Sequence, residues 1–155
     1  MMKYSSINVC SKEEFVTIEI TSDEKPNISD ITIRKWQDII DLISLSVNVP
    51  SVLIMSFDEK QINVFLKSNS KDNPYKEGEK ADLLSTLYSE TVALNNACLL
   101  VPNALTDPLW GGNHDIKLNM ISYLGFPILW PDGEVFGTIC ALDNKENHYN
   151  NQYIN

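Results

Sequence analysis

The chain has 155 residues, a formal charge of −9 and a hydrophobic content of 43%. These values are typical of one globular domain with a full-sized core. The acidic balance disfavours nucleic acid and anionic membrane surfaces as partners, because both present phosphate groups. The sequence contains neither an apolar run near the ~20 residues of a membrane span nor an N-terminal apolar core of a secretory leader, so we expect no membrane insertion in this segment. The three cysteines, Cys10, Cys98 and Cys140, lie far apart, and we expect reduced thiols in a cytoplasmic protein.

Residues 1–29 are predicted to form an N-terminal extension. The segment Phe15–Ile20 is rich in β-branched residues, and we expect it to add one strand. A polar stretch containing Pro26 follows and interrupts regular structure. We therefore expect a single domain over residues 30–155.

The first helix is predicted to start at Ser29 or Asp30, which are suitable N-cap residues. Apolar side chains then recur every three or four positions, at Trp36, Ile39, Ile40, Ile43 and Val47. Asn48 and Val49 precede Pro50, and a residue before proline disfavours helical geometry, so the helix should end there. Trp36 has two alternative contacts, the sheet or a dimer partner.

Shorter apolar runs predict further elements along the chain. Residues 51–57, 62–67 and 99–101 are predicted to be strands, and residues 83–96 a helix. Residues 68–80 are polar without a hydrophobic face, so we expect a surface loop. A short helix is expected to follow Asn113 or Asp115.

Residues 123–143 are predicted to form a central hairpin. Pro131-Asp132-Gly133 separates two runs that are apolar at nearly every position. Glycine in the last position suits a three-residue hairpin loop with a left-handed final residue. Strands without alternation are covered on both faces. The order of elements therefore indicates an α+β domain built on an antiparallel-rich sheet.

The hairpin resembles the most characteristic segment of the GAF domain family. It reads Tyr-Leu-Gly-Phe-Pro-Ile from residue 123 and, after Asp-Gly, Phe-Gly-Thr-Ile-Cys-Ala-Leu-Asp from residue 136. Further similarity lies at residues 36–40, 49–55, 73–75, 87–92 and 100–105, so the resemblance covers about residues 30–155. It implies a central antiparallel sheet of about five or six strands, with helices on one face and loops or short helices over the other. The family's last helix would begin near Tyr149 and be truncated.

The sequence looks most like GAF domains of bacterial multidomain sensors that precede diguanylate cyclase or histidine kinase modules. This resemblance implies a noncatalytic domain that senses a small molecule, with no cofactor or metal, and regulates a downstream effector. It also implies a homodimer formed through the first and last helices.

By resemblance to bilin-binding relatives, the ligand pocket lies over one face of the hairpin. Its candidate residues are Leu124, Phe126 and Ile128 on one strand, Thr138, Cys140 and Leu142 on the next, Tyr88 and Thr91 on the preceding helix, and Trp110, His114 and Asp115 in the loop above. Each of these residues also has a purely structural interpretation, as core, loop anchor or cap.

Two alternative functions remain at this stage. One is a GAF domain without a ligand that serves as a dimerisation spacer. The other is a thiol-dependent free methionine-(R)-sulfoxide reductase, which requires an accessible thiolate. Those enzymes have a cysteine near the position of Ser89, and this chain has none between Cys98 and Cys140, so the reductase is the weaker alternative.

Overall fold

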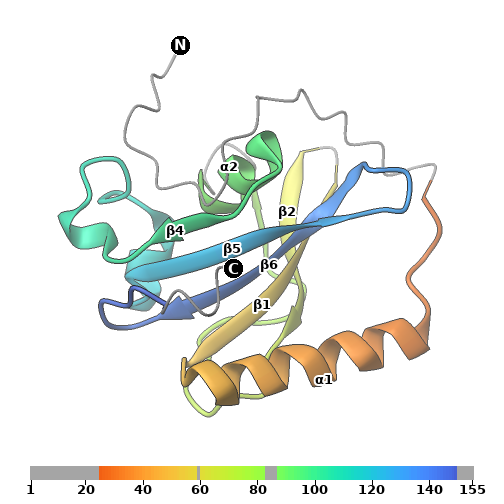
Figure 1. The fold of residues 1–155 in the computed structure, drawn as a ribbon, viewed down its shortest axis with the longest axis horizontal. Coiled ribbons are helices and arrows are strands. Elements are labelled where there is room, and N and C mark those ends of the chain that lie inside the picture. The colour runs from red at the N-terminus through yellow and green to blue at the C-terminus, as the bar shows by residue number, and fades with distance from the viewer. Residues whose placement is uncertain (1–24, 59, 83–86, 150–155) are drawn as a thin grey trace.

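The computed structural model describes residues 25–58, 60–82 and 87–149. In this part of the chain, helix α1 lies across one face of an antiparallel sheet, and helix α2 with its neighbouring loops covers the other face (Figure 1). The expected α+β architecture is therefore confirmed. The strand expected at Phe15–Ile20 lies outside the described residues, as does almost all of the last helix expected over residues 149–155.

Helix α1 spans Asp30–Val47, as its sequence predicts. The Ser29 hydroxyl accepts a hydrogen bond of 3.3 Å from the backbone N–H of Thr32, which satisfies one of the free donors of the first turn. Asn48 closes the helix in a left-handed conformation, with φ of 56°. Both ends of α1 are thus fixed by short polar side chains adjacent to the apolar stripe.

The sheet has the strand order β3-β2-β1-β6-β5-β4. Its strands are β1 (Ser51–Phe57), β2 (Gln61–Lys67), β3 (Lys80–Asp82), β4 (Leu99–Val101), β5 (Ser122–Leu129) and β6 (Val135–Asp143). Helix α2 spans Leu87–Asn95, and two short 3-10 helices, η2 (Ala104–Thr106) and η3 (His114–Leu118), lie between β4 and β5. Strand β3 and helix η2 were not predicted.

The β5–β6 hairpin closes with the predicted three-residue loop. The Trp130 N–H donates a hydrogen bond of 2.7 Å to the Glu134 carbonyl, and Gly133 has a φ of 90°. The Asp132 side chain accepts from the Glu134 N–H at 3.0 Å. Lys25 forms ion pairs with Asp132 and Glu134, so the segment before α1 is held at this loop.

A β-bulge near the loop changes the register of the hairpin. Leu129 pairs with Val135, but Ile128 pairs with Gly137, which leaves Phe136 as the extra residue on β6. Side chains alternate between the two faces of a strand. One extra residue therefore moves every later side chain of that strand to the opposite face of the sheet. A similar irregularity between β1 and β2 leaves Phe65 unpaired.

The two extra phenylalanines meet on the α1 side of the sheet. The ring centroids of Phe65 and Phe136 lie 5.4 Å apart in an edge-to-face arrangement, and the Trp36 ring lies 6.1 Å and 5.3 Å from them. Such contacts are favourable geometries for aromatic pairs. Of the two alternatives for Trp36, the structure therefore places its ring against the sheet.

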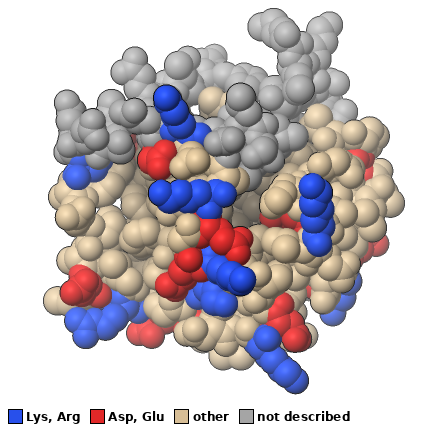
Figure 2. Space-filling view, turned by 180° about the vertical axis from the view of Figure 1, so that it is seen from behind, with Lys and Arg blue, Asp and Glu red and all other residues tan. Residues whose placement is uncertain are grey.

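The sheet separates two apolar layers. The α1 layer contains Ile40, Val52, Ile54, Leu66, Leu124, Phe136 and Ala141. The α2 layer contains Leu53, Val64, Tyr75, Tyr88, Val92, Trp110, Tyr123, Cys140 and Leu142. Basic and acidic side chains are interspersed on the face shown in Figure 2. None of the helices within the described ranges combines the length and apolar character needed to cross a bilayer.

Candidate functional site

A small cavity lies in the α2 layer, beneath the loops that precede β3 and β5. Its volume is about 40 Å³. The lining combines apolar and polar side chains, namely Leu53, Met55, Ile62, Tyr75, Tyr88, Ser89, Asp115, Tyr123, Cys140 and Leu142. A mainly apolar hollow with a few placed polar groups is typical of ligand sites.

Two tyrosine hydroxyls in this lining form no hydrogen bond of good geometry among the described residues, although the Ser89 hydroxyl and the Cys140 thiol lie near the Tyr123 oxygen. Tyr88 is 3% and Tyr123 is 1% exposed, and their rings stack with centroids 4.4 Å apart. A buried hydroxyl without a partner costs roughly 1–3 kcal/mol. Burial raises the pKa of both phenols, so both remain neutral and keep their protons. The site therefore contains two groups that can each donate and accept a hydrogen bond.

Gly125 makes the position of the Tyr123 ring possible. The two residues point to the same face of β5, and the ring extends along the strand over the glycine. A β-carbon at Gly125 would lie 2.2 Å from the Tyr123 hydroxyl oxygen, well inside any real contact.

Asp115 and Tyr75 connect the two loops that cover the cavity. The Tyr75 hydroxyl donates a 2.5 Å hydrogen bond to the Asp115 carboxylate, across 40 positions of sequence. Asn113 caps η3 and accepts from the Asp115 N–H at 2.9 Å, which fixes the start of this short helix. Burial raises the pKa of Asp115, while the Tyr75 bond and nearby His114 lower it.

A second polar pair lies between α2 and β6. The Ser89 and Thr138 hydroxyls share a hydrogen bond of 3.3 Å, and Thr138 is fully buried. This pair satisfies two hydroxyls beside the cavity without help from a ligand.

The cysteines do not form a reactive pair in this structure. Cys140 lines the cavity, is 4% exposed, and burial raises the pKa of its thiol, which therefore stays protonated. Cys98 takes part in a disulfide bond. The expectation of free thiols is thus wrong for Cys98, while Cys140 is free. Among the described residues, no group of three or more His, Cys, Asp or Glu side chains is placed to hold a metal ion.

The predicted site residues separate into several groups. Tyr88, Cys140, Asp115 and Leu142 line the cavity. Thr138 contacts Ser89 beside it, and Trp110 packs behind Tyr88 with ring centroids 4.9 Å apart.

Thr91 is buried, and its carbonyl accepts from Asn95 within α2. His114 is exposed on η3 and does not line the cavity.

Three predicted residues lie on the opposite face of the sheet. Leu124, Phe126 and Ile128 pack in the α1 layer, so the prediction that they share a face with Cys140 is wrong. The reason is the register: Gly125 lies opposite Cys140, and Phe126 lies opposite Ile139. Leu124 and Phe126 instead line an apolar groove of about 220 Å³ beside α1 and Tyr149, and the lining of this groove also includes Cys140.

The prediction missed Tyr75, Ser89 and Tyr123 as cavity residues. Tyr123 and Gly125 carry a signal, since an aromatic residue two positions before glycine in a strand suggests a ring folded over the glycine. Tyr75 lies in a polar loop without periodicity, so its contact with Asp115 has no local signature.

The sheet order and the two covering layers define an α+β domain with a small cavity on the α2 side. The sequence profile of the GAF domain matches residues 34–154. The chain therefore belongs to the GAF domain family, a class of regulatory and sensory domains. Compared with curated proteins, the chain has no significant match.

Solved structures share this fold at low sequence identity. The NreA protein of Staphylococcus aureus, mutated in its nitrate binding site, is 19% identical, with 82% of this chain and 94% of that chain covered and a TM-score of 0.60. A GAF domain of a two-component sensor histidine kinase from Bacillus halodurans is 14% identical, with coverages of 81% and 83% and a TM-score of 0.60. The type II free methionine-R-sulfoxide reductase of Thermoplasma acidophilum is 12% identical, with coverages of 77% and 79% and a TM-score of 0.59.

Proposed function

We propose that this GAF domain is a noncatalytic sensor that binds a small polar molecule in the cavity of the α2 layer. The observation that carries the proposal is the pair of buried hydroxyls without a hydrogen-bond partner on Tyr88 and Tyr123, two residues that line the cavity. A domain that served only as a spacer would be more stable with phenylalanine at both positions, because the rings would pack equally well without the unpaired hydroxyls. A ligand that bonds to both hydroxyls gives them a role.

Ligand binding can alter an output only if two states of the protein bind the ligand unequally. The Tyr75–Asp115 bond is suited to this, since it joins the two covering loops beside the cavity. We place the output in a downstream effector of a signalling protein, of the diguanylate cyclase or histidine kinase type. The likeness to a histidine kinase GAF domain supports this at the level of fold.

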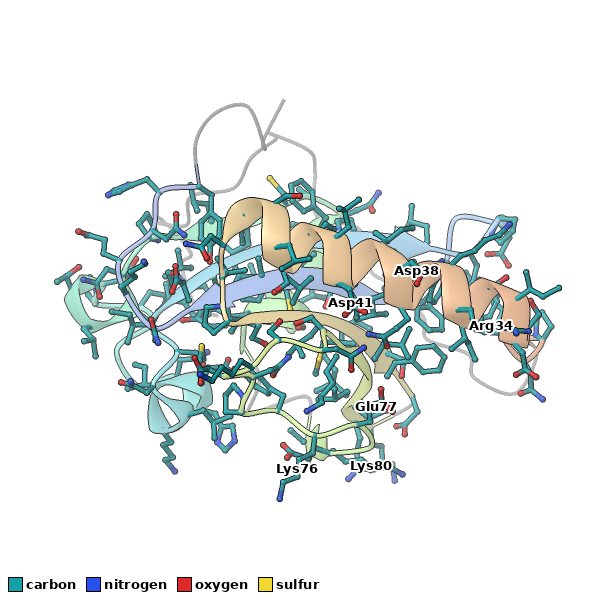
Figure 3. The ribbon with its side chains drawn as sticks, turned by 90° about the horizontal axis from the view of Figure 1, so that it is seen from below. Arg34, Asp38, Asp41, Lys76, Glu77 and Lys80 are labelled. Carbon is teal, nitrogen blue, oxygen red and sulfur yellow. The ribbon has the colours of Figure 1, made fainter. Side chains whose placement is uncertain are left out.

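A homodimer through α1 is the second part of the proposal. Ile31, Leu42 and Leu45 are 62%, 65% and 80% exposed, on the side of the helix opposite its buried stripe. The charged residues Arg34, Asp38 and Asp41 follow one another along the same helix, whereas Lys76 and Glu77 lie in the loop before β3 and Lys80 begins that strand (Figure 3). Leu42 and Leu45 lie one turn apart on this side, and we expect a second copy of the chain to cover them.

The spacer remains the second candidate, because the cavity is small and the rest of the α2 layer is filled. The reductase has less support. Its chemistry needs an accessible thiolate, whereas Cys140 is buried with a raised thiol pKa and Cys98 is disulfide-bonded.

Thermal denaturation with a panel of small anions, neutral amides and amines tests the sensor against the spacer. We expect one class to raise Tm by about 5–10 °C at a hundredfold excess over Kd. The Tyr88→Phe, Tyr123→Phe double variant should keep the fold and lose this response. If no compound shifts Tm and the double variant is simply more stable than the wild type, the domain is a spacer.

A further inference from the structure

The size of the tyrosine-lined cavity limits what it can hold. A water molecule needs about 10–15 Å³ of such volume, and the cavity offers about 40 Å³. A ligand that matches this volume therefore has about one to three non-hydrogen atoms.

The oxygens around the cavity are mostly free to accept hydrogen bonds. The Tyr88 and Tyr123 hydroxyls have no partner within the described ranges, although neither oxygen is accessible to water as the two rings stand. The Asp115 side chain accepts one bond, from Tyr75, and the Tyr75 oxygen can itself accept another. A ligand with several N–H donors would satisfy these oxygens together.

The charged side chains of the lining favour a cation over an anion as the ligand. Asp115 is its one acidic side chain, and it contains no Lys, Arg or His among the residues that the structure describes. An anion would be enclosed beside a carboxylate with no compensating positive charge, which is strongly unfavourable in a water-poor site. A cation would gain a charge-assisted bond to the same carboxylate.

We infer that this cavity takes a small protonated amine, of the size of ammonium or methylammonium, with Asp115 as its counter-ion and the Tyr88 and Tyr123 oxygens as acceptors. This inference rests on the proposed sensory function and names the chemical class of its ligand. The Ser89–Thr138 pair and the apolar side chains of Leu53 and Leu142 close the remaining sides. Larger amines are excluded by size.

An NMR titration of the folded domain tests the ligand class. Methylammonium chloride is compared with potassium chloride at equal ionic strength, and with sodium nitrate and urea as an anionic and a neutral probe. We expect saturable shifts of the Ser89, Thr138 and Cys140 amides with methylammonium alone. Potassium chloride controls for the general attraction of cations to a chain of charge −9.

Matched variants distinguish binding in the cavity from general attraction to surface charges. Asp115→Asn should weaken methylammonium binding at least about tenfold, since a hydrogen bond to a charged group is lost. Asp72→Asn removes the same charge from an exposed position in the loop that carries Tyr75, and it should leave the affinity within about twofold of wild type. Tyr88→Phe and Tyr123→Phe keep the rings, so they test the site even if Asp115→Asn does not fold.

The outcomes distinguish this inference from the proposed function. Binding of nitrate or urea at these amides, without methylammonium, overturns the amine and leaves a sensor of another ligand class. Methylammonium binding that Asp115→Asn or both Tyr→Phe variants leave unchanged also overturns the amine site. No saturable shift with any probe overturns both.

Discussion

At the scale of single residues, Gly125 and Tyr123 show how one missing side chain positions a functional group. The Tyr123 ring occupies the space in which a side chain at position 125 would stand. The hydroxyl therefore lies over Gly125, in the layer that lines the cavity. A glycine inside a strand usually weakens it, and here it is explained by the close approach of a neighbouring ring.

The substitution Gly125→Ala is expected to destabilise the domain by about 1–3 kcal/mol, because the added methyl group overlaps the Tyr123 ring and overpacks the layer. Urea unfolding would measure the change. Gly112→Ala is the matched control, since a β-carbon there meets nothing within 4 Å and its backbone is unstrained. In a Tyr123→Leu background the overlapping ring atoms are absent, so the cost of Gly125→Ala should shrink. An equal cost in both backgrounds would contradict this explanation.

At the scale of elements, α1 could be predicted closely because its signals are local. Ser29 and Asn48 lie at its two ends, and the apolar stripe between them has helical spacing. Strand β3 could not be predicted in this way. It has three residues, two of them charged, and its place is set by pairing with the first residues of β2.

The hairpin shows where prediction of the site failed. A three-residue loop followed by regular pairing would place Leu124 opposite Cys140 and Phe126 opposite Thr138. The bulge at Phe136 shifts the pairing by one residue, so Gly125 and Pro127 take those positions. The sequence hides this shift because both strands are apolar on both faces, and no alternation marks the residue where the faces exchange.

The substitution Ser29→Ala is expected to lower the free energy of unfolding by about 1 kcal/mol, because the Thr32 N–H loses its acceptor at the helix start. Ser46→Ala makes the same chemical change on the exposed side of the last turn of α1. It should be neutral or slightly stabilising, since alanine has the higher helix propensity. Chemical denaturation of both variants gives the comparison, and an equal loss in the two would show that the cap does not contribute.

At the scale of the whole molecule, the two layers divide the proposed roles. The α2 layer holds the cavity and its covering loops, whereas the α1 layer ends in a helix whose outer side carries exposed leucines among charged residues. The central strands β1 and β6 belong to both layers, so a change on one face reaches the other through shared backbone. This arrangement suits a sensor in which ligand binding at α2 alters contacts made by α1.

The proposed α1 interface leads to a test of assembly. The double substitution Leu42→Glu, Leu45→Glu should weaken self-association at least about tenfold, because it removes two apolar contacts and places like charges across a two-fold axis. The monomer should keep its stability to within about 0.5 kcal/mol, since both side chains are exposed. Sedimentation equilibrium over a range of concentrations would measure both the association and its loss.

Leu105→Glu provides the control, because Leu105 is 60% exposed on η2 and does not belong to α1. It adds the same charge to an exposed leucine and should leave the association constant unchanged. An equal effect of both changes would indicate that net charge, already −9, governs association. A wild-type domain that stays monomeric at every concentration would refute the interface. If dimerisation is lost only in the α1 variant, the exposed leucines of α1 form the contact with a second copy of the chain. If the ligand also changes the association constant, binding at the cavity is coupled to the dimer interface.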